Sequence, residues 1–231
     1  NLDDKYIKLR VSTDENNFYM AFHFEEINGV YKLVDFYDYS FGVMLSKKLG
    51  LISQLAYSLT PWNQGPTRQL FNAINLYKSG DAQSALDILD QLPEYFLKPK
   101  ELMAIYIEVA STISEAKLNE KLAVVDQHYR GDPLVSYMLS SLYLSNNDIP
   151  QTITSLKQFL MTFGPDSEIY SAIANLYFSE NDLTNALIYA NKSIRLNPND
   201  DRAYWALARV FAKQSEFSDV VLALEVLRSY F

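Results

Sequence analysis

Asp35 is a carboxylate in a position that could support acid–base chemistry. The β-hairpin predicted from its neighbours places Asp35 opposite Phe22, on an apolar face that also carries Tyr37, with His23 on the reverse face. A carboxylate among apolar side chains stays protonated more readily unless it is hydrogen-bonded or paired. Asp35 would then be an acid or base in a pocket. Alternatively it hydrogen-bonds backbone amides or tyrosine hydroxyls, or caps the next helix, and we favour this structural role.

Other catalytic and metal-binding patterns are missing from the sequence. The two histidines, His23 and His128, lie far apart, and there is no cysteine, so we expect no zinc cluster, thiol nucleophile or disulfide. The seven glycines form no phosphate-binding loop, and no nucleophile-elbow motif occurs. We therefore expect no catalytic residue, no metal, no cofactor and no enzymatic activity.

The elements that would position Asp35 form a β-meander. Residues 5–40 alternate apolar and polar side chains with period two. Asn28-Gly29 lies between two β-prone runs and predicts a two-residue turn, in which both residues adopt positive φ. This turn makes Glu25 oppose Lys32. We expect a three-stranded antiparallel meander, followed by a helix over about residues 41–59.

The rest of the chain is organised by a repeat. Three aromatic residues recur at intervals of 34 residues: Tyr143, Tyr177 and Phe211. The positions four residues before and after them also match: Leu139, Ile173 and Leu207, then Asn147, Asn181 and Ser215, each followed by Asp148, Asp182 or Glu216. Such a period is typical of stacked helix–turn–helix units, since one unit cannot bury its own apolar face. Helix pairs are predicted near 67–79 and 82–92, 99–115 and 118–129, 133–145 and 149–163, 166–179 and 183–195, and 200–213 and 217–230.

The segment Ser167 to Asp200 resembles a tetratricopeptide repeat (TPR). Its large residues Tyr170, Ile173 and Tyr177, its small residues Ala174, Ala186 and Ser193, and the closing Pro198 all match that family's pattern. The small residues of a TPR let two helices approach closely. Extended loosely over residues 66–231, the resemblance implies a mainly α fold, a right-handed α-α superhelix of TPR-like hairpins. The small N-terminal antiparallel meander and its helix would precede it.

The stretch from Thr60 to Pro66 is the predicted linker, because two prolines and a glycine interrupt periodic structure. We therefore divide the chain into residues 1–60 and 61–231. The run Phe18 to Tyr39 resembles the closing strands of a cystatin-like or nuclear-transport-factor-2-like (NTF2-like) sheet, which implies a domain that begins before Asn1. A plain three-stranded cap on the helical array is the alternative.

The TPR resemblance also implies a binding surface, because the first helices of TPR hairpins line a concave groove. It places three sets of residues there: Leu134, Tyr137, Ser141 and Leu144; Glu168, Ser171, Asn175 and Phe178; and Arg202, Trp205, Arg209 and Lys213. The predicted partner-binding residues are Tyr137, Asn175, Phe178, Arg202, Trp205, Arg209 and Lys213. Trp and Arg often carry binding energy, and the cations suit an acidic or C-terminal peptide. The carboxylate-clamp pattern is not met, since Ser171 stands where a lysine is needed. Alternatively, Trp205 packs on a neighbouring helix and the arginines are solvated.

Composition narrows the partner class. A net charge of −8 and a pI near 4.8 argue against nucleic acid, whose phosphates need a basic surface. No apolar run approaches the roughly 20 residues of a membrane span. The compartment stays open. The last predicted helix is apolar around much of its circumference, which predicts an exposed patch covered by a second copy of the chain or by residues beyond it.

We therefore expect a non-enzymatic, bacterial-type scaffold that captures a protein or peptide partner in a TPR groove. The alternative is a ligand-binding or enzymatic NTF2-like or cystatin-like N-terminal domain, with the repeats used for assembly.

Overall fold

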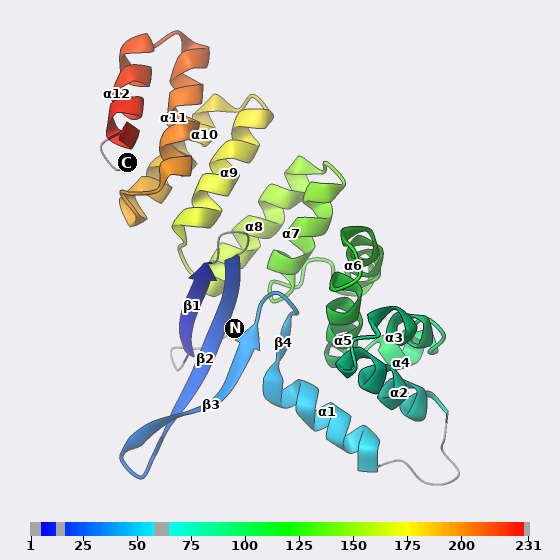
Figure 1. Ribbon diagram of the computed structural model, residues 1–231. Helices are drawn as coiled ribbons and strands as arrows, with labels where there is room; N and C mark the ends of the chain where they lie inside the picture. The colour runs from blue at the N-terminus through cyan, green and yellow to red at the C-terminus, as the bar shows by residue number, and fades with distance from the viewer. Residues whose placement is uncertain (1–5, 13–16, 58–64, 229–231) are drawn as a thin grey trace. The chain divides into compact units, whose positions relative to one another are not determined.

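The computed structural model describes residues 6–12, 17–57 and 65–228 (Figure 1). The chain is mainly helical, with an antiparallel sheet near its N-terminus. It forms two compact units, Asn1–Ser145 and Asn146–Phe231, called here the N-terminal and C-terminal units. The division predicted at residues 60 and 61 stays a prediction, and most of the predicted linker lies outside the described residues.

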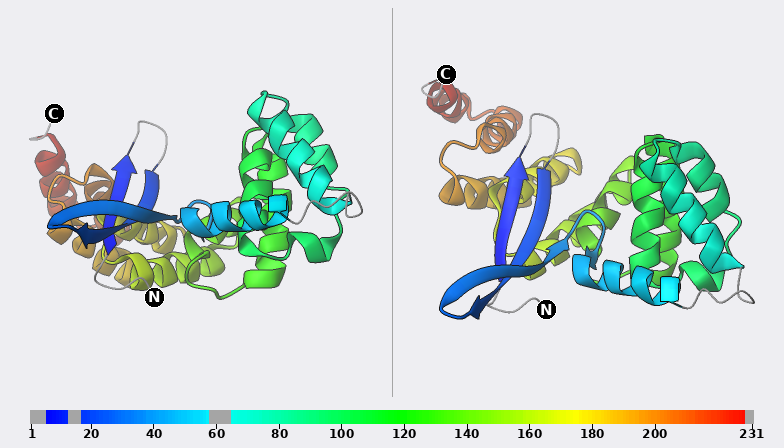
Figure 2. Two further views of the ribbon diagram at one scale, coloured as in Figure 1. Left: turned by 90° about the horizontal axis from the view of Figure 1, so that it is seen from below. Right: turned by 60° about the horizontal axis from the view of Figure 1, so that its bottom comes forward.

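The sheet of the N-terminal unit has strand order β1-β2-β3-β4, all neighbours antiparallel. Its strands are β1 (Tyr6–Ser12), β2 (Asn17–Ile27), β3 (Val30–Asp38) and β4 (Val43–Met44). Asn28 and Gly29 have φ of 55° and 75°, so the predicted turn is confirmed. The β2–β3 ribbon is strongly twisted in both views of Figure 2. The fourth, two-residue strand was not predicted, and it delays the following helix, α1, to Leu45–Tyr57.

The predicted strand register is correct near the turn and wrong beyond it. Glu25 pairs with Lys32 as expected, but a β-bulge between His23 and Phe24 shifts the rest of the ladder by one residue. Asp35 therefore opposes His23, and Phe22 opposes Phe36. A one-residue shift moves side chains to the other face of a sheet. Asp35 thus lies on the face of Tyr37, as predicted, but its neighbour across the ladder on that face is His23 and not Phe22.

Asp35 has the structural role that the sequence favoured. Its Oδ1 accepts hydrogen bonds from the backbone N–H groups of Phe36 at 2.8 Å and Ser46 at 3.0 Å, and the Ser46 hydroxyl donates to Oδ2. Ser46 lies in the first turn of α1, where backbone N–H groups have no partner within the helix. Asp35 therefore caps α1 from a neighbouring strand.

The buried face of the sheet packs against helices of the same unit. Tyr19, Tyr37 and Tyr39 are almost fully buried there. The Tyr37 hydroxyl donates to the carbonyl oxygen of Leu134 at 2.9 Å, and the ring centroids of Tyr19 and Tyr137 lie 4.7 Å apart. Burial, followed by the nearby Asp132 carboxylate, raises the pKa of Tyr37 far above its usual value. Its hydroxyl therefore stays protonated and remains a donor.

Every predicted helix pair has a counterpart. The helices of the N-terminal unit after α1 are α2 (Pro66–Lys78), α3 (Ala82–Leu89), α4 (Glu94–Leu97), α5 (Lys100–Ser111), α6 (Glu115–Tyr129) and α7 (Ser136–Ser145). Those of the C-terminal unit are α8 (Ile149–Phe163), α9 (Ser167–Ser179), α10 (Leu183–Leu196), α11 (Asp201–Gln214) and α12 (Phe217–Arg228). The break between α5 and α6 comes earlier than predicted, because Ser114 caps α6 by accepting from Lys117 N at 3.2 Å. The four-residue α4 was not predicted.

The 34-residue spacing is explained by a recurring turn. Asn147, Asn181 and Ser215 all adopt left-handed backbone conformations, with φ of 57°, 63° and 63°. This conformation ends a helix, and asparagine tolerates it better than most residues. Next to the two asparagines, the Asp148 and Asp182 side chains cap α8 and α10, accepting from the backbone N–H of the third residue on at 3.2 and 3.0 Å. The repeat thus encodes one helix stop followed by one helix start.

The small TPR-type residues lie at close helix contacts in the C-terminal unit. Ala174, Ala186 and Ser193 are all fully buried, as the resemblance predicts. The Ser193 hydroxyl lies 2.8 Å from the carbonyl oxygen of Ser167 and also contacts the Asp200 carboxylate. Ser193 on α10 therefore ties together the N-terminal ends of α9 and α11.

A buried carboxylate in the N-terminal unit makes stability depend on pH. Asp126 on α6 pairs with Arg130 and accepts a hydrogen bond from the Tyr143 hydroxyl. The Arg130 hydrogen bond holds the pKa of Asp126 below its ordinary value against the opposing effect of burial, and Tyr143 adds to the lowering. Because the pKa is lower in the folded state, this stabilisation is present above the unfolded pKa, about 3.9, and is lost as the pH falls through the folded value.

We expect Asp126→Asn to lower the free energy of unfolding by about 1–3 kcal/mol at pH 7, since it weakens charge-assisted hydrogen bonds of a buried group. The difference from wild type should shrink below about pH 4, where the wild-type carboxyl is also neutral. Urea unfolding at a series of pH values measures both effects. Asp87→Asn, at an exposed position of α3, is the control. A wild-type-to-variant difference that stays constant with pH would contradict the assignment.

Candidate partner-binding site

The predicted binding residues of the C-terminal unit lie on two neighbouring helices. α9 and α11 are the first helices of successive hairpins, and they contact each other as well as α10 between them in the chain (Figure 1). Residues one helical turn apart on these helices face the same side. We call the surface made by Phe178 and Asn175 of α9 with Trp205, Arg209 and Lys213 of α11 the α9–α11 face.

Phe178 is the centre of this face. The Arg209 guanidinium carbon lies 4.1 Å from the Phe178 ring centroid, and the Lys213 ammonium lies 5.4 Å from it. Both distances are typical of cation–π contacts, each worth about 0.5–1 kcal/mol at an exposed site. The ring therefore holds two cations close together that would otherwise repel each other.

Asn175 fixes the orientation of the arginine. Its amide nitrogen donates to the carbonyl oxygen of Ser171 at 3.0 Å, and its Oδ1 accepts from Arg209 Nη1 at 3.1 Å. The first bond leaves the amide oxygen directed at the guanidinium. Arginine carries five N–H donors in a planar fork, so Arg209, which is exposed, keeps donors that can bind a carboxylate while it is held against Phe178.

The other end of the face carries less free charge. Arg202 forms an ion pair with Glu168, whose side chain is much less exposed than that of Arg202. Trp205, one turn from Arg209 on α11, is 54% exposed. A tryptophan this exposed beside two cations offers apolar contact area next to hydrogen-bond donors. Trp205 is therefore about half covered by its neighbours and half exposed to solvent.

Two residues that the sequence assigned to the groove have other surroundings. Ser171 is fully buried, and its hydroxyl donates to the carbonyl oxygen of Glu168 at 3.0 Å. Tyr137 belongs to the N-terminal unit, where its ring packs on Tyr19 and its hydroxyl donates to the carbonyl oxygen of Asn17 at 3.3 Å. The structure therefore brings together Asn175, Phe178, Arg209 and Lys213, with Arg202 and Trp205 on the same helix as the last two.

A second group of cations and rings in this unit was not predicted. The Lys157 ammonium lies 5.0 and 5.4 Å from the ring centroids of Tyr177 and Tyr189, and the Lys192 ammonium lies 4.4 Å from Tyr189. Burial disfavours the charge of Lys157, but the Tyr177 hydrogen bond and the nearby tyrosines outweigh it, so the pKa of Lys157 is raised. The i, i+3 spacing of Tyr189 and Lys192 was the available sequence signal. Lys157, which contacts the same tyrosine rings, lies on α8, and no sequence pattern pointed to it.

The described residues contain neither a metal-ion cluster nor a membrane-spanning helix. Within residues 6–12, 17–57 and 65–228, no three His, Asp or Glu side chains are grouped so that they could hold a metal ion. None of the helices in those ranges has the length and apolar character needed to cross a bilayer. The groups that the α9–α11 face offers a partner are its two cations, the Asn175 amide and its aromatic rings.

The fold resembles several solved TPR structures. YrrB, described as a TPR protein with an unusual peptide-binding site, matches 79% of this chain and 91% of its own, with a TM-score of 0.59 and 12% identity. The crystal structure of MamA matches 72% of this chain and 92% of its own, with a TM-score of 0.58 and 14% identity. MamA 41-end from Desulfovibrio magneticus RS-1 matches 71% and 92%, with a TM-score of 0.54 and 13% identity. At these identities the likeness concerns the fold.

The fold and its repeats define a TPR-type helical-repeat protein. Residues 100–229, more than half of the chain, match the ChAPs family, described as Chs5p-Arf1p-binding proteins. The chain belongs to this family. No curated protein matches it in a direct sequence comparison. The resemblance of the N-terminal strands to a cystatin-like or NTF2-like sheet stays a prediction.

Proposed function

We propose that this protein is a non-enzymatic scaffold that binds a partner protein through the α9–α11 face. The observation that carries the proposal is the Arg209 guanidinium stacked on Phe178, with Lys213 beside it and an exposed Trp205 one turn away. A preorganised arginine loses little conformational freedom on binding, and tryptophan and arginine dominate interface energetics. Arg202 belongs to the proposal as a flanking contact on α11, and the predicted partner contact of Tyr137, which lies in the N-terminal unit, stays a separate prediction.

The family supports a protein as the partner. ChAPs are described by their binding to Chs5p and Arf1p, so these two proteins are the first to test. YrrB, which is similar in fold, is described as having a peptide-binding site. Both descriptions favour a protein or peptide over a small substrate. They leave open which face of this chain the partner contacts.

The chemistry of the face favours an acidic segment. Arg209 and Lys213 are two cations next to an aromatic ring, and a carboxylate suits their donors in charge and geometry. The protein as a whole carries a net charge of −8, which repels an acidic partner at long range. Binding of such a partner should therefore depend on local contacts and should weaken as salt screens them.

A peptide titration tests this proposal. The probe is a fluorescently labelled extended 12-residue peptide with four glutamates and one tryptophan, and its control has glutamine at the four positions. We expect the glutamate peptide to bind at least about 10-fold more tightly in fluorescence anisotropy, equivalent to about 1.4 kcal/mol, and to lose affinity with added salt. Equal binding of the two peptides, or no binding of either, would overturn the acidic-partner proposal.

The proposal of a non-enzymatic function rests on what the chain's carboxylates do. Asp35 caps α1, and Asp38, whose pKa is raised by burial, accepts from the backbone N–H of Ser40 at 2.8 Å and so stabilises the turn after β3. Both carboxylates therefore stabilise the fold of the N-terminal unit through these hydrogen bonds. The alternative function, an enzymatic N-terminal domain, needs a carboxylate or histidine directed into a pocket, and neither aspartate has that placement.

We propose that the terminal helix binds a second copy of the chain. On α12, Ala223 and Leu227 are buried, whereas Val221 and Leu222 are 54% and 60% exposed, next to an exposed Phe217. An isologous pairing across a two-fold axis covers such a patch on both copies at once. We expect sedimentation at micromolar concentration to show a dimer and Leu222→Glu to show a monomer. A wild-type monomer throughout that range would contradict the proposal.

A further inference from the structure

The N-terminal unit contains a recess that the proposed function does not use. It has a volume of about 430 Å³ and lies where the sheet meets α5, α6 and α7. Its walls come from the start of β2, the turn after β3 and three helices: Asn17, Phe18, Ser40, Phe41, Ile107, Ser111, Leu118, Leu122, Tyr137, Met138 and Ser141. This volume falls in the range of small-molecule sites, roughly 300–1,000 Å³.

The walls of this recess carry no charge at neutral pH. Seven of the eleven lining residues are aromatic or aliphatic, and the other four are serines and an asparagine. Ser111 Oγ already donates to the carbonyl oxygen of Glu108 at 2.8 Å. The exposed Ser141 lies on the opposite helix, α7, and keeps a hydroxyl at the rim. A mainly apolar site with a few hydroxyls suits a ligand with an apolar body and a neutral polar end.

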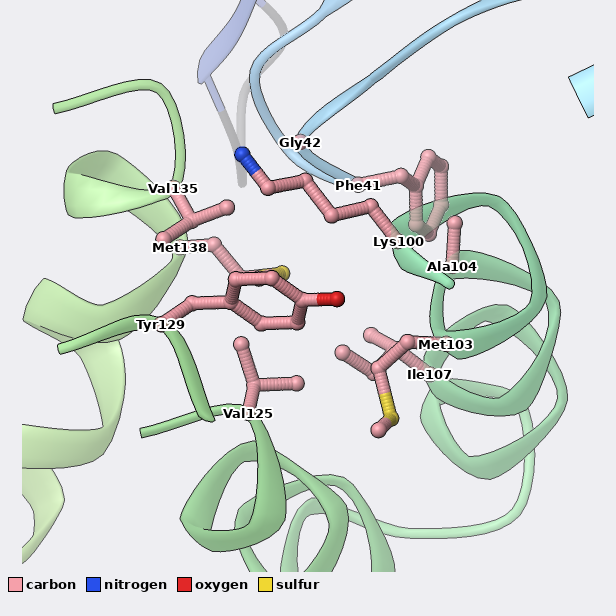
Figure 3. Close-up of a pocket in the computed structure, with 10 residues that line it drawn as sticks. All are labelled: Phe41, Gly42, Lys100, Met103, Ala104, Ile107, Val125, Tyr129, Val135 and Met138. Carbon is pink, nitrogen blue, oxygen red and sulfur yellow. The ribbon is translucent and has the colours of Figure 1, made fainter. Parts of the chain in front are cut away.

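The floor of the recess is held in place by close packing. Phe41, Ile107 and Met138 also line a much smaller void of about 10 Å³ behind it, the size of a single water (Figure 3). Figure 3 shows Val125, Tyr129 and Met103 converging on this void from the helices. At Gly42, beside Phe41, an added Cβ would lie 2.8 Å from Val135 Cγ1. The turn that carries Phe41 is therefore in tight contact with Val135, the residue directly before α7, and the recess is preformed.

We propose that this recess binds an uncharged, mainly apolar small molecule with a neutral hydrogen-bonding end. Its apolar body lies between the rings of Phe41 and Tyr137 and against Leu122 and Met138, and its polar end meets Ser141 and Asn17 at the rim. An ionised ligand is disfavoured because the lining offers no opposite charge to offset its desolvation. The recess and the α9–α11 face are made of different residues, so either one can be tested without the other.

Nile red, a neutral dye whose fluorescence rises in apolar surroundings, is the probe. We expect saturable binding to the wild-type protein and at least a 10-fold higher Kd for Ser141→Phe, because the added ring fills the recess. Ser145→Phe is the matched control, since Ser145 is exposed on the same helix one turn on and does not line the recess. It should bind as wild type does. Ser111→Phe, on the opposite wall, repeats the test if Ser141→Phe does not fold.

Two further measurements decide the location and the ligand class. Methyl NMR should show a shift of the Met138 ε-methyl on addition of Nile red and no shift of Met161, which is 86% exposed and lies in the C-terminal unit. The Kd should stay within about twofold between 50 and 500 mM salt, because no charged group takes part. Equal binding by wild type and both blocking variants, or an unmoved Met138 signal, would overturn the proposal. A Kd that rises steeply with salt would overturn the neutral class.

Discussion

Replacing Arg209 with glutamate should lower the affinity of the protein for the acidic probe peptide at least about 100-fold. Loss of one partner of a close charge pair costs about 2–5 kcal/mol in an interface, and 2.7 kcal/mol corresponds to 100-fold. Charge reversal also places a carboxylate beside those of the peptide. The effect is large because Arg209 touches both Phe178 and Asn175, so its loss also leaves Lys213 as the remaining cation on that ring.

Three controls separate binding from folding. Arg209→Glu should melt within a few degrees of wild type, because a change at an exposed position rarely exceeds about 0.5 kcal/mol and an exposed cation–π contact adds about 0.5–1. Arg195→Glu changes the net charge equally at an exposed position on α10, and it should bind almost normally. Arg209→Lys keeps the charge but loses the planar fork, so its affinity should be intermediate.

The outcome that would contradict this prediction is specific. If Arg209→Glu binds the peptide as tightly as Arg195→Glu does, the affinity depends on overall charge and not on the α9–α11 face. Arg209→Glu and Arg195→Glu should also be compared for binding to purified Arf1p and Chs5p, whatever the peptide result. Loss of protein binding only in Arg209→Glu supports the face as the partner site. Equal binding by both variants would place the partner elsewhere on the chain.

Replacing Ala174 with leucine should lower the free energy of unfolding by about 1–3 kcal/mol. Ala174 on α9 is fully buried, next to a cluster of alanines on α10 and α11 that includes Ala190 and Ala206. Helices separated by alanines are too close to admit three more carbons without moving apart. Overpacking of this kind shifts side chains from their preferred rotamers and displaces backbone.

Urea unfolding followed by circular dichroism measures this effect. Ala212→Leu is the matched control, because Ala212 is exposed on α11 and leucine is nearly as good a helix former as alanine. It should change stability by no more than about 0.5 kcal/mol. An unchanged midpoint in Ala174→Leu would mean that α9 and its neighbours are not in close contact at this position. The TPR-type packing of this unit would then be wrong.

The sequence by itself determined the features that depend on neighbouring residues. Asn28-Gly29 specifies its turn because few other residue pairs accept positive φ twice in succession. Asn147-Asp148 and Asn181-Asp182 each end one helix and begin the next through local hydrogen bonds. The helix pairs, and the assignment of Asn175, Phe178, Arg209 and Lys213 to first helices, followed from this 34-residue period.

Tertiary structure decided what depends on residues distant in the chain. The bulge at His23/Phe24 placed His23 in place of Phe22 opposite Asp35, and the Asp35 carboxylate caps α1. Period-two alternation does not reveal an inserted residue. Ser171 is buried because α9 packs against α8, α10 and α11. A helical sequence period does not distinguish such a buried position from one that lines a groove. The stacking of Arg209 on Phe178 and the recess beside Tyr137 join residues 31 and more than 90 positions apart. Such contacts arise when side chains from separate elements fill a shared volume, and local sequence does not encode that volume.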